Sequence, residues 1–321
     1  MKKSFFPLLV LGLFIFLLLS YLSIIDLSKA NNETLKIEPQ KNEYIYKEEL
    51  LNLGYNINEI TTIENKINIQ NVKNYLLNKK YDNLIKLLSS PYFKIENIER
   101  YENYYKNNPN YSLDEITLYV QIGLDKEFYT DIKEINDYYE TTALVNKYNK
   151  LPQEINYDDL VQINKPYSND GTKKLRSVAL EPLKEMIDEA KKDGIKLFVV
   201  SGYRTMKQQN YLFNNSVKKN GIDHALVYSA KKGHSEHQLG LAVDLNTTQN
   251  SFEKTKQYKW LKQNSYKYGF IERYPKGKEF ITGYAFEPWH YRYLGVDIAT
   301  KIFEENITYE EYLVKYDNES F

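Results

Sequence analysis

The pattern of apolar and polar residues divides the chain into three parts, of which the first is an uncharged stretch at residues 5–25. A secretory signal has an apolar centre of roughly 7–15 residues, whereas a spanning helix needs about 20, so this stretch favours an uncleaved anchor. Small residues before Asn31 leave cleavage after Ala30 open. The lysines at positions 2–3 predict that the N-terminus is cytoplasmic and the remaining chain is outside. Residues 1–30 are therefore expected to be a signal anchor or a signal peptide.

The second part, residues 31–144, is rich in Asn, Lys, Glu and Tyr, and its apolar residues recur at helical spacing. The sets Val72, Tyr75, Leu76 and Leu84, Leu87, Leu88 illustrate the spacing. A motif with a polar N-cap and an acidic first turn occurs at residues 54–60, 92–98 and 110–116. The distances along the chain between these three copies are too uneven for a regular solenoid. We therefore expect a spacer made of short helices.

The third part, residues 145–321, has a mixed α/β pattern. An apolar stripe predicts a helix over 175–192, ended by Asp193-Gly194, in which Pro182 kinks the helix or starts a second one. Residues 195–200 form a continuous apolar run that predicts a buried strand, and a second helix is expected over 206–219.

The amino-acid composition limits the partners and the catalytic groups that this chain can use. Lys and Arg number 43, as do Asp and Glu, so the formal net charge is zero and no global positive field favours nucleic acid. The sequence contains no cysteine, which excludes disulfides, thiolate nucleophiles and cysteine metal ligands. Any metal ion would therefore have to be bound by carboxylates and by the four histidines.

The first chemical cluster is His234-Ser235-Glu236-His237-Gln238-Leu239-Gly240-Leu241-Ala242-Val243-Asp244-Leu245. On a strand, Asp244 shares a face with Ala242, while Leu241, Val243 and Leu245 lie on the other face. Gly240 allows a turn that returns His237 over the first face, where one imidazole and one carboxylate can meet one metal ion.

The second cluster, Phe286-Glu287-Pro288-Trp289-His290-Tyr291-Arg292-Tyr293, places Glu287 and His290 three residues apart. They would face opposite sides of a regular strand, so both can serve one site only if Pro288 bends the chain. With His290 as a third ligand, a fourth position stays open for water, which is typical of catalytic zinc, and Glu287 is the natural general base.

The third cluster, Ser201-Gly202-Tyr203-Arg204, follows the predicted strand, and Gln208 and Gln209 lie on the next helix. An arginine at a strand end is well placed to meet a substrate carboxylate or a developing oxyanion.

Together these motifs resemble the VanY-type D-alanyl-D-alanine carboxypeptidases, part of a group of zinc peptidases that includes lysostaphin-like enzymes and the hedgehog fold. The resemblance extends from about Val145 to Leu313. It includes SGYR at 201–204, SEHQLGLAVD at 235–244, RYP at 273–275, TGY at 282–284 and EPWHYRYLG at 287–295.

The resemblance implies an α+β domain with a small antiparallel sheet and flanking helices over 145–321. It implies one Zn²⁺ held by His237, Asp244 and His290, with Glu287 as catalytic base and Arg204 stabilising the oxyanion. Residues expected to contact the terminal residue of the peptide are Arg204, Gln209 and Ser235, with Trp289 as a further candidate for substrate binding.

The expected function is removal of the C-terminal D-Ala from peptidoglycan stem peptides. An L,D-carboxypeptidase acting on tetrapeptide stems and a peptidoglycan endopeptidase stay open, and a non-enzymatic wall-binding module is disfavoured because no ligand position is replaced. A serine-type enzyme is also disfavoured, since the S-x-x-K matches at 216–219 and 229–232 lack K-T-G or S-D-N partners. We expect a monomer on the extracytoplasmic face of the bacterial membrane, or secreted to the cell wall if the signal is cleaved.

Overall fold

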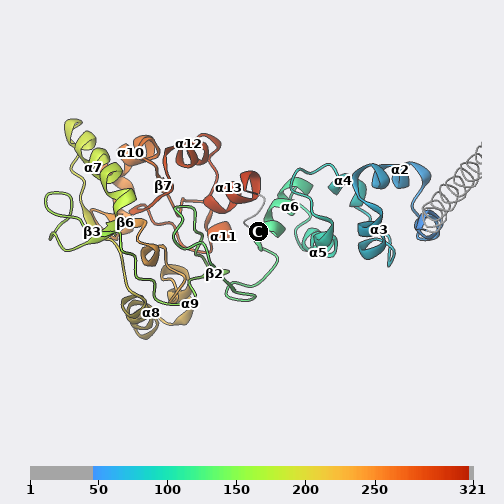
Figure 1. Cartoon of the computed structure of the whole chain (residues 1–321), viewed down its shortest axis with the longest axis horizontal. Helices are drawn as coiled ribbons and strands as arrows, with labels where there is room; N and C mark the ends of the chain where they lie inside the picture. Colours follow the sequence, from blue (N-terminus) through green and yellow to red (C-terminus); the bar gives the residue numbers. More distant parts are fainter. Residues whose placement is uncertain (1–45, 318–321) are drawn as a thin grey trace, which may run out of the picture. The chain divides into compact units, whose positions relative to one another are not determined.

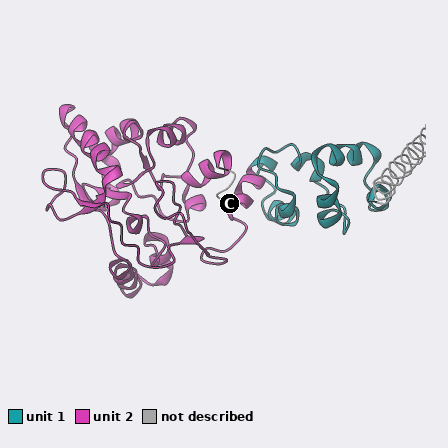
Figure 2. Ribbon diagram, viewed as in Figure 1, with its two compact units in different colours: residues 1–114 teal, residues 115–321 magenta. Residues whose placement is uncertain are grey.

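The computed structural model describes residues 46–317, which form two compact units, one ending at Asp114 and one beginning at Glu115 (Figure 2). The predicted signal anchor at residues 1–30 lies outside the described residues. Within residues 46–317, no helix combines the length and the apolar character that crossing a bilayer requires.

The first unit consists of short helices, as its spacing predicted. They are α2 (Ile57–Lys66), α3 (Ile69–Tyr75), α4 (Leu84–Leu87), η1 (Ile95–Asn97) and α5 (Ile98–Asn107). The first predicted cap is confirmed, since the Glu59 amide donates to Asn56 Oδ1 at 3.0 Å and the Asn56 amide donates to Glu59 Oε2 at 2.8 Å. In the second motif Lys94 provides no side-chain cap.

The second unit begins before residue 145, where the sequence placed the boundary of the catalytic domain. Helix α6 (Leu113–Ile122) enters this unit, and Tyr119 packs edge-on against Phe280 with ring centroids 5.5 Å apart. Strand β1 (Lys133–Glu134) then pairs in parallel with β2 (Asn149–Lys150). Residues 115–144 are thus packed with the unit that carries the chemical clusters.

A four-stranded antiparallel sheet with the order β5-β6-β8-β7 forms the centre of this unit. Its strands are β5 (Val199–Ser201), β6 (Ala242–Leu245), β7 (Phe270–Glu272) and β8 (His290–Tyr293). In this register Asp244 lies opposite Ser201 on one side and His290 on the other. The three clusters therefore meet on adjacent strands, and the predicted α+β class with a small antiparallel sheet is confirmed.

The alternation along β6 follows the predicted pattern. Leu241, Val243 and Leu245 belong to the main hydrophobic core, together with Leu183 and Met186 of α7 (Ser177–Lys192). This leaves Asp244 on the opposite face of the strand.

Helix α7 continues through Pro182, so the expectation of a second helix starting there was wrong. Proline removes the hydrogen bond to the carbonyl four residues earlier, that of Val178, a residue that is 42% exposed and open to solvent. The predicted strand at 195–200 begins later, because the Ile195 amide donates to Ala190 O at 2.8 Å and closes the C-terminus of α7.

The remaining elements surround the sheet, and Figure 1 shows α7, α10 and α12 along one side of the unit with α8 and α9 on the other. The second helix of the sequence analysis is α8 (Met206–Asn220), capped by Thr205 and Gln208. The others are β3 (Leu160–Gln162), β4 (Lys174–Arg176), α9 (Ile222–Tyr228), η2 (Glu236–Leu239), η3 (Asn250–Lys254), α10 (Lys256–Asn264), η4 (Ser265–Tyr268), α11 (Glu279–Thr282), α12 (Val296–Glu305) and α13 (Tyr309–Tyr316).

Candidate active site

His237, Asp244 and His290 form one buried cluster in which a ligand atom of each lies within 4.8 Å of the others. His237 Nε2 is 3.4 Å and His290 Nδ1 is 3.1 Å from Asp244 Oδ1. Each of the three residues is 3% exposed. The sequence predicted this convergence, and the pairing of β6 with β8 produces it.

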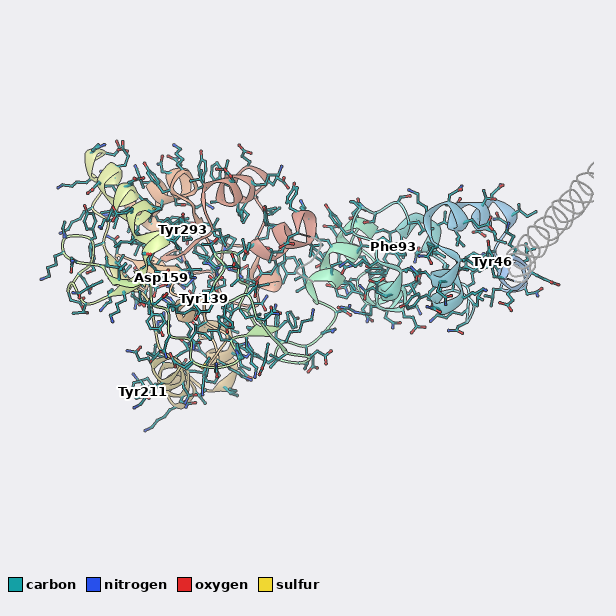
Figure 3. All side chains as sticks on the ribbon, in the orientation of Figure 1. Tyr46, Phe93, Tyr139, Asp159, Tyr211 and Tyr293 are labelled. Atoms are coloured by element: carbon teal, nitrogen blue, oxygen red, sulfur yellow. The ribbon has the colours of Figure 1, made fainter. Side chains whose placement is uncertain are left out.

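Gly240 makes the turn that brings His237 back towards β6. Its φ of 68° lies in the left-handed region, and a Cβ atom there would be 2.9 Å from Arg176 Cγ and 3.1 Å from Leu160 Cδ2. Arg176 itself is held by Asp159 and by the carbonyl of Tyr139, both labelled in Figure 3. Only glycine fits this turn without displacing its neighbours.

The second nitrogen of each histidine is engaged by an acceptor. His237 Nδ1 lies 2.8 Å from the carbonyl oxygen of Gly202, which can only accept, so Nδ1 donates and Nε2 keeps its lone pair. His290 Nε2 lies 3.4 Å from Glu236 Oε2 and Nδ1 lies 3.1 Å from Asp244 Oδ1, so each ring nitrogen faces a carboxylate. A metal ion on Nδ1 would leave Nε2 as the donor to Glu236. His237 Nε2 and His290 Nδ1 both face Asp244 Oδ1.

This donor set fits a zinc ion. Two neutral imidazole nitrogens and one carboxylate oxygen are ligands that Zn²⁺ prefers, and three protein ligands are typical of a catalytic site. Both imidazoles have their outer nitrogen hydrogen-bonded, as zinc-bound histidines usually do.

Glu287 adjoins the cluster through a turn and not through a bend within the strand. The His290 amide donates to the Glu287 carbonyl at 3.1 Å, with Pro288 next to Glu287 in the turn before β8. Glu287 Oε2 is 3.9 Å from His290 Nδ1. Burial raises the pKa of the Glu287 carboxyl to about 7, a value suited to a group that exchanges protons near neutral pH.

Arg204 lies on the other side of Asp244. Its Nη2 donates to Asp244 Oδ2 at 3.3 Å and its Nη1 donates to Gln209 Oε1 at 2.8 Å. Gln209 in turn donates through Nε2 to the carbonyl of Ala230 at 2.7 Å. These bonds hold the guanidinium beside the donor set.

A cavity of about 450 Å³ unites these groups. Every residue that the sequence predicted for the site lines it: Arg204, Gln209, Ser235, His237, Asp244, Glu287, Trp289 and His290. Sequence reasoning missed the rest of the lining: Tyr228, Ser229, Ala230, Thr248, Gln249, Asn250, Tyr274 and Tyr284. They come from the end of α9, the start of η3 and loops whose approach to the site depends on the fold, although Tyr274 and Tyr284 fall in the quoted RYP and TGY motifs.

A buried charge network behind His290 was also missed. Glu236 Oε1 accepts hydrogen bonds from Arg273 Nε at 2.7 Å and from Arg292 Nη1 at 3.0 Å. Arg273 also binds Glu310 of α13, with Nη2 2.6 Å from Oε1. The signal was the presence of charged residues within apolar motifs at 273 and 292. The network is electrically balanced by two carboxylates and two guanidinium groups.

The fold and the site agree with known proteins. A family described as VanY, D-alanyl-D-alanine carboxypeptidase, matches residues 172–296. The protein named "Putative carboxypeptidase YodJ" of Bacillus subtilis (strain 168) is 40% identical over 211 residues, which cover 61% of this chain and 77% of the relative. This chain belongs to the VanY D-alanyl-D-alanine carboxypeptidase family.

Two further VanY-like relatives bear on specificity. A D-alanyl-D-alanine carboxypeptidase of Enterococcus faecalis (strain ATCC 700802 / V583) is 40% identical over 53% of this chain and 64% of its own length. The solved structure of the LdcB LD-carboxypeptidase is 40% identical with a TM-score of 0.54, covering 59% of this chain and 92% of that chain. Family membership confirms the prediction of a carboxypeptidase, a hydrolase, and it agrees with the zinc-type donor set.

Proposed function

We propose that this chain is a zinc-dependent D-alanyl-D-alanine carboxypeptidase that removes the terminal D-Ala from peptidoglycan stem peptides. The observation that carries the proposal is the position of Glu287, a buried carboxyl beside a two-histidine, one-aspartate donor set in the cavity of a VanY-family chain. His237 Nε2, an Asp244 carboxylate oxygen and His290 Nδ1 would hold the ion. Bound zinc supplies Lewis acidity, which lowers the pKa of a water ligand towards about 7 and polarises the scissile carbonyl.

Glu287 is the group that moves the proton. Its carboxylate accepts a proton from the attacking water and then delivers that proton to the nitrogen of the departing D-Ala. A pKa of about 7 lets the carboxyl carry out both transfers near neutral pH. The overall reaction adds water across one amide bond, so no covalent link to the protein is needed.

Arg204 supplies a positive charge in the same cavity as Glu287. Its guanidinium, oriented by Asp244 and Gln209, can hydrogen-bond either the developing oxyanion or the carboxylate at the end of the peptide. Gln209, Ser235 and Trp289 line the same cavity, and we assign them to binding the terminal residue.

A second candidate function is L,D-carboxypeptidase activity on tetrapeptide stems. It is favoured by the likeness to the LdcB LD-carboxypeptidase, which equals the Enterococcus faecalis D,D enzyme in sequence identity at 40%. The two reactions share the metal site and the base and differ in the stereocentre that precedes the scissile bond.

We further infer that the enzyme works outside the cytoplasmic membrane as a monomer. Residues 5–25 carry no charge and follow two lysines, as in a signal anchor, and the substrate that we assign lies in the cell wall. Fractionation of cells and light scattering of the purified chain test location and oligomeric state.

The decisive experiment follows D-Ala release from muropeptides ending in L-Lys-D-Ala-D-Ala and in L-Lys-D-Ala, with and without chelator. Release from the pentapeptide alone, abolished by chelator and restored by zinc, is expected for the D,D enzyme. Release from the tetrapeptide would assign the L,D reaction to the same site. No release from either peptide by zinc-loaded protein would contradict a carboxypeptidase function.

A further inference from the structure

Lys147 is a buried lysine that contacts Tyr284, a residue of the cavity lining. Its side chain donates from Nζ to the carbonyl of Leu226 at 2.8 Å, and the residue is 3% exposed. The same atom lies over three aromatic rings, 4.6 Å from the centroid of Phe128, 5.6 Å from Tyr129 and 4.8 Å from Tyr284. Within residues 46–317 no carboxylate forms an ion pair with Lys147, so aromatic faces and one carbonyl are what stabilise the charge.

The two segments that Lys147 joins are both walls of the cavity. Tyr284 lines it directly, and α9, which carries Leu226, ends at the lining residue Tyr228. The Ala285 amide donates to Val227 O at 3.1 Å, so backbone and side chain connect the same two segments. The α9 wall continues to Ala230, whose carbonyl accepts the hydrogen bond from Gln209.

Residues 128–131 form a short segment, the strap, that contacts this junction and lies outside the family match at 172–296. The hydroxyl of Tyr129 is 3.3 Å from that of Tyr284. Phe128 and Lys147 pack closely against Gly283, the residue before Tyr284. A Cβ atom on Gly283 would lie 2.8 Å from Phe128 Cζ and 2.9 Å from Lys147 Cδ. The strap thus contacts the Tyr284 wall through two aromatic side chains.

The backbone of the strap is itself unusual. Tyr129 has a φ of 67°, a conformation that bulky residues rarely adopt and that persists where the surroundings enforce it. The surroundings of its ring include Lys231, with Nζ 4.2 Å from the centroid, and His234, edge-on at 5.0 Å. Conformations of this kind are concentrated at ligand sites.

We propose that Lys147 is a positioning residue of the carboxypeptidase. It holds the Tyr284 wall, with the help of Tyr129, at a set distance from the α9 wall, and so shapes the cavity that receives the end of the stem peptide. This inference rests on the proposed function, because it assigns the walls to peptide binding.

A lysine at position 147 does not favour the stability of the folded protein. Burial lowers the pKa of Lys147 to about 8, which means that the folded protein accommodates the charged form less well than water does. Methionine has a similar length and would bury the same stem without the charge. A residue that served only the fold would therefore be replaceable by methionine without loss, whereas a positioning residue would not.

The test compares full-length Lys147→Met with the matched control Lys133→Met. Lys133 is an exposed lysine in β1. The measurements are kcat and KM for D-Ala release, zinc content and the free energy of unfolding. For Lys147→Met we expect KM to rise about tenfold, as for the loss of a desolvated cation–π cluster, with kcat within about twofold and zinc unchanged. The control is expected to match the unmodified chain.

Unchanged KM and kcat in a folded Lys147→Met protein would overturn the inference. If that variant does not fold, Tyr129→Phe replaces it as the test, because this substitution removes only the hydroxyl that lies 3.3 Å from the Tyr284 hydroxyl. A rise in KM of Tyr129→Phe would support the positioning role, and an unchanged KM would refute it. A lack of D-Ala release by the unmodified chain would instead contradict the proposed function, so the two failures are distinguishable.

Discussion

His290 directs Nε2 towards Glu236 Oε2 at 3.4 Å and Nδ1 towards Asp244 Oδ1 at 3.1 Å. Glu236 is 1% exposed, and its other oxygen is bound by Arg273 and Arg292. A carboxylate on the outer nitrogen of a histidine fixes the tautomer and raises the basicity of the inner nitrogen. Glu236 therefore prepares His290 Nδ1 to bind a metal ion.

Glu236→Gln is predicted to weaken zinc binding, because the neutral amide is a poorer acceptor for His290 Nε2. Loss of such a partner typically lowers metal affinity about 10–100-fold, which competition with a chelator would measure. Glu310→Gln is the matched control, since it changes the same network at Arg273 without a contact to His290. An equal loss of affinity in both variants would attribute the effect to network charge and not to His290.

Glu287→Gln is predicted to abolish proton transfer while leaving the donor set intact. We expect kcat for D-Ala release to fall about 10²–10⁴-fold, the usual contribution of a general base. Zinc content should remain that of the unmodified chain, because Glu287 is not among the predicted ligands. Glu304→Gln, an exposed carboxyl on α12, is the control. Near-normal turnover in Glu287→Gln would refute the assignment of the base.

Arg204→Lys tests whether charge alone suffices beside the metal site. Lysine cannot reproduce the two directed bonds to Asp244 and Gln209, so we expect kcat/KM to fall about 10–100-fold, corresponding to roughly 1.5–3 kcal/mol. Steady-state kinetics would measure the fall, with Arg100→Lys in the first unit as control. Full activity in Arg204→Lys would mean that a point charge is enough.

The burial of the Lys147 ammonium group leads us to predict that the stability of the protein depends on pH. Burial first, and Lys231 second, lower its pKa in the folded protein from 10.5 to about 8. Between these values the unfolded chain binds more protons than the folded one, so stability rises with pH across the interval. Below about pH 8 Lys147 is charged in both the folded and the unfolded chain, so the full free-energy cost of burying its charge is present.

The corresponding measurement is the free energy of unfolding of the unmodified chain and of Lys147→Met from pH 7 to 10. The methionine variant is expected to be the more stable at pH 7, and its advantage should shrink as pH rises above about 8. Lys133→Met should follow the unmodified chain throughout. A difference that does not change with pH would contradict the buried-charge account.

Local patterns were enough for much of the fold. The helix predicted over 206–219 is observed over Met206–Asn220, where a capping box of Thr205 and Gln208 is a short-range signal. The start of β5 was not, because Ile195 closes the preceding helix by a hydrogen bond to Ala190 and has no part in the strand. The early start of the second unit was also hidden, since β1 consists of exposed polar residues with no apolar alternation.

The sequence by itself determined the chemistry of the site: which residues carry nitrogen and carboxylate donors, in which order, and on which strand face Asp244 lies. This was possible because the donors lie in compact motifs whose spacing restricts their geometry. The tertiary structure alone decided which nitrogen of each histidine faces Asp244, with the other nitrogen beside the Gly202 carbonyl or Glu236. It also decided that Lys147 and Tyr129 contact Tyr284 of the cavity lining, because those contacts join residues that are distant in sequence and follow no periodicity.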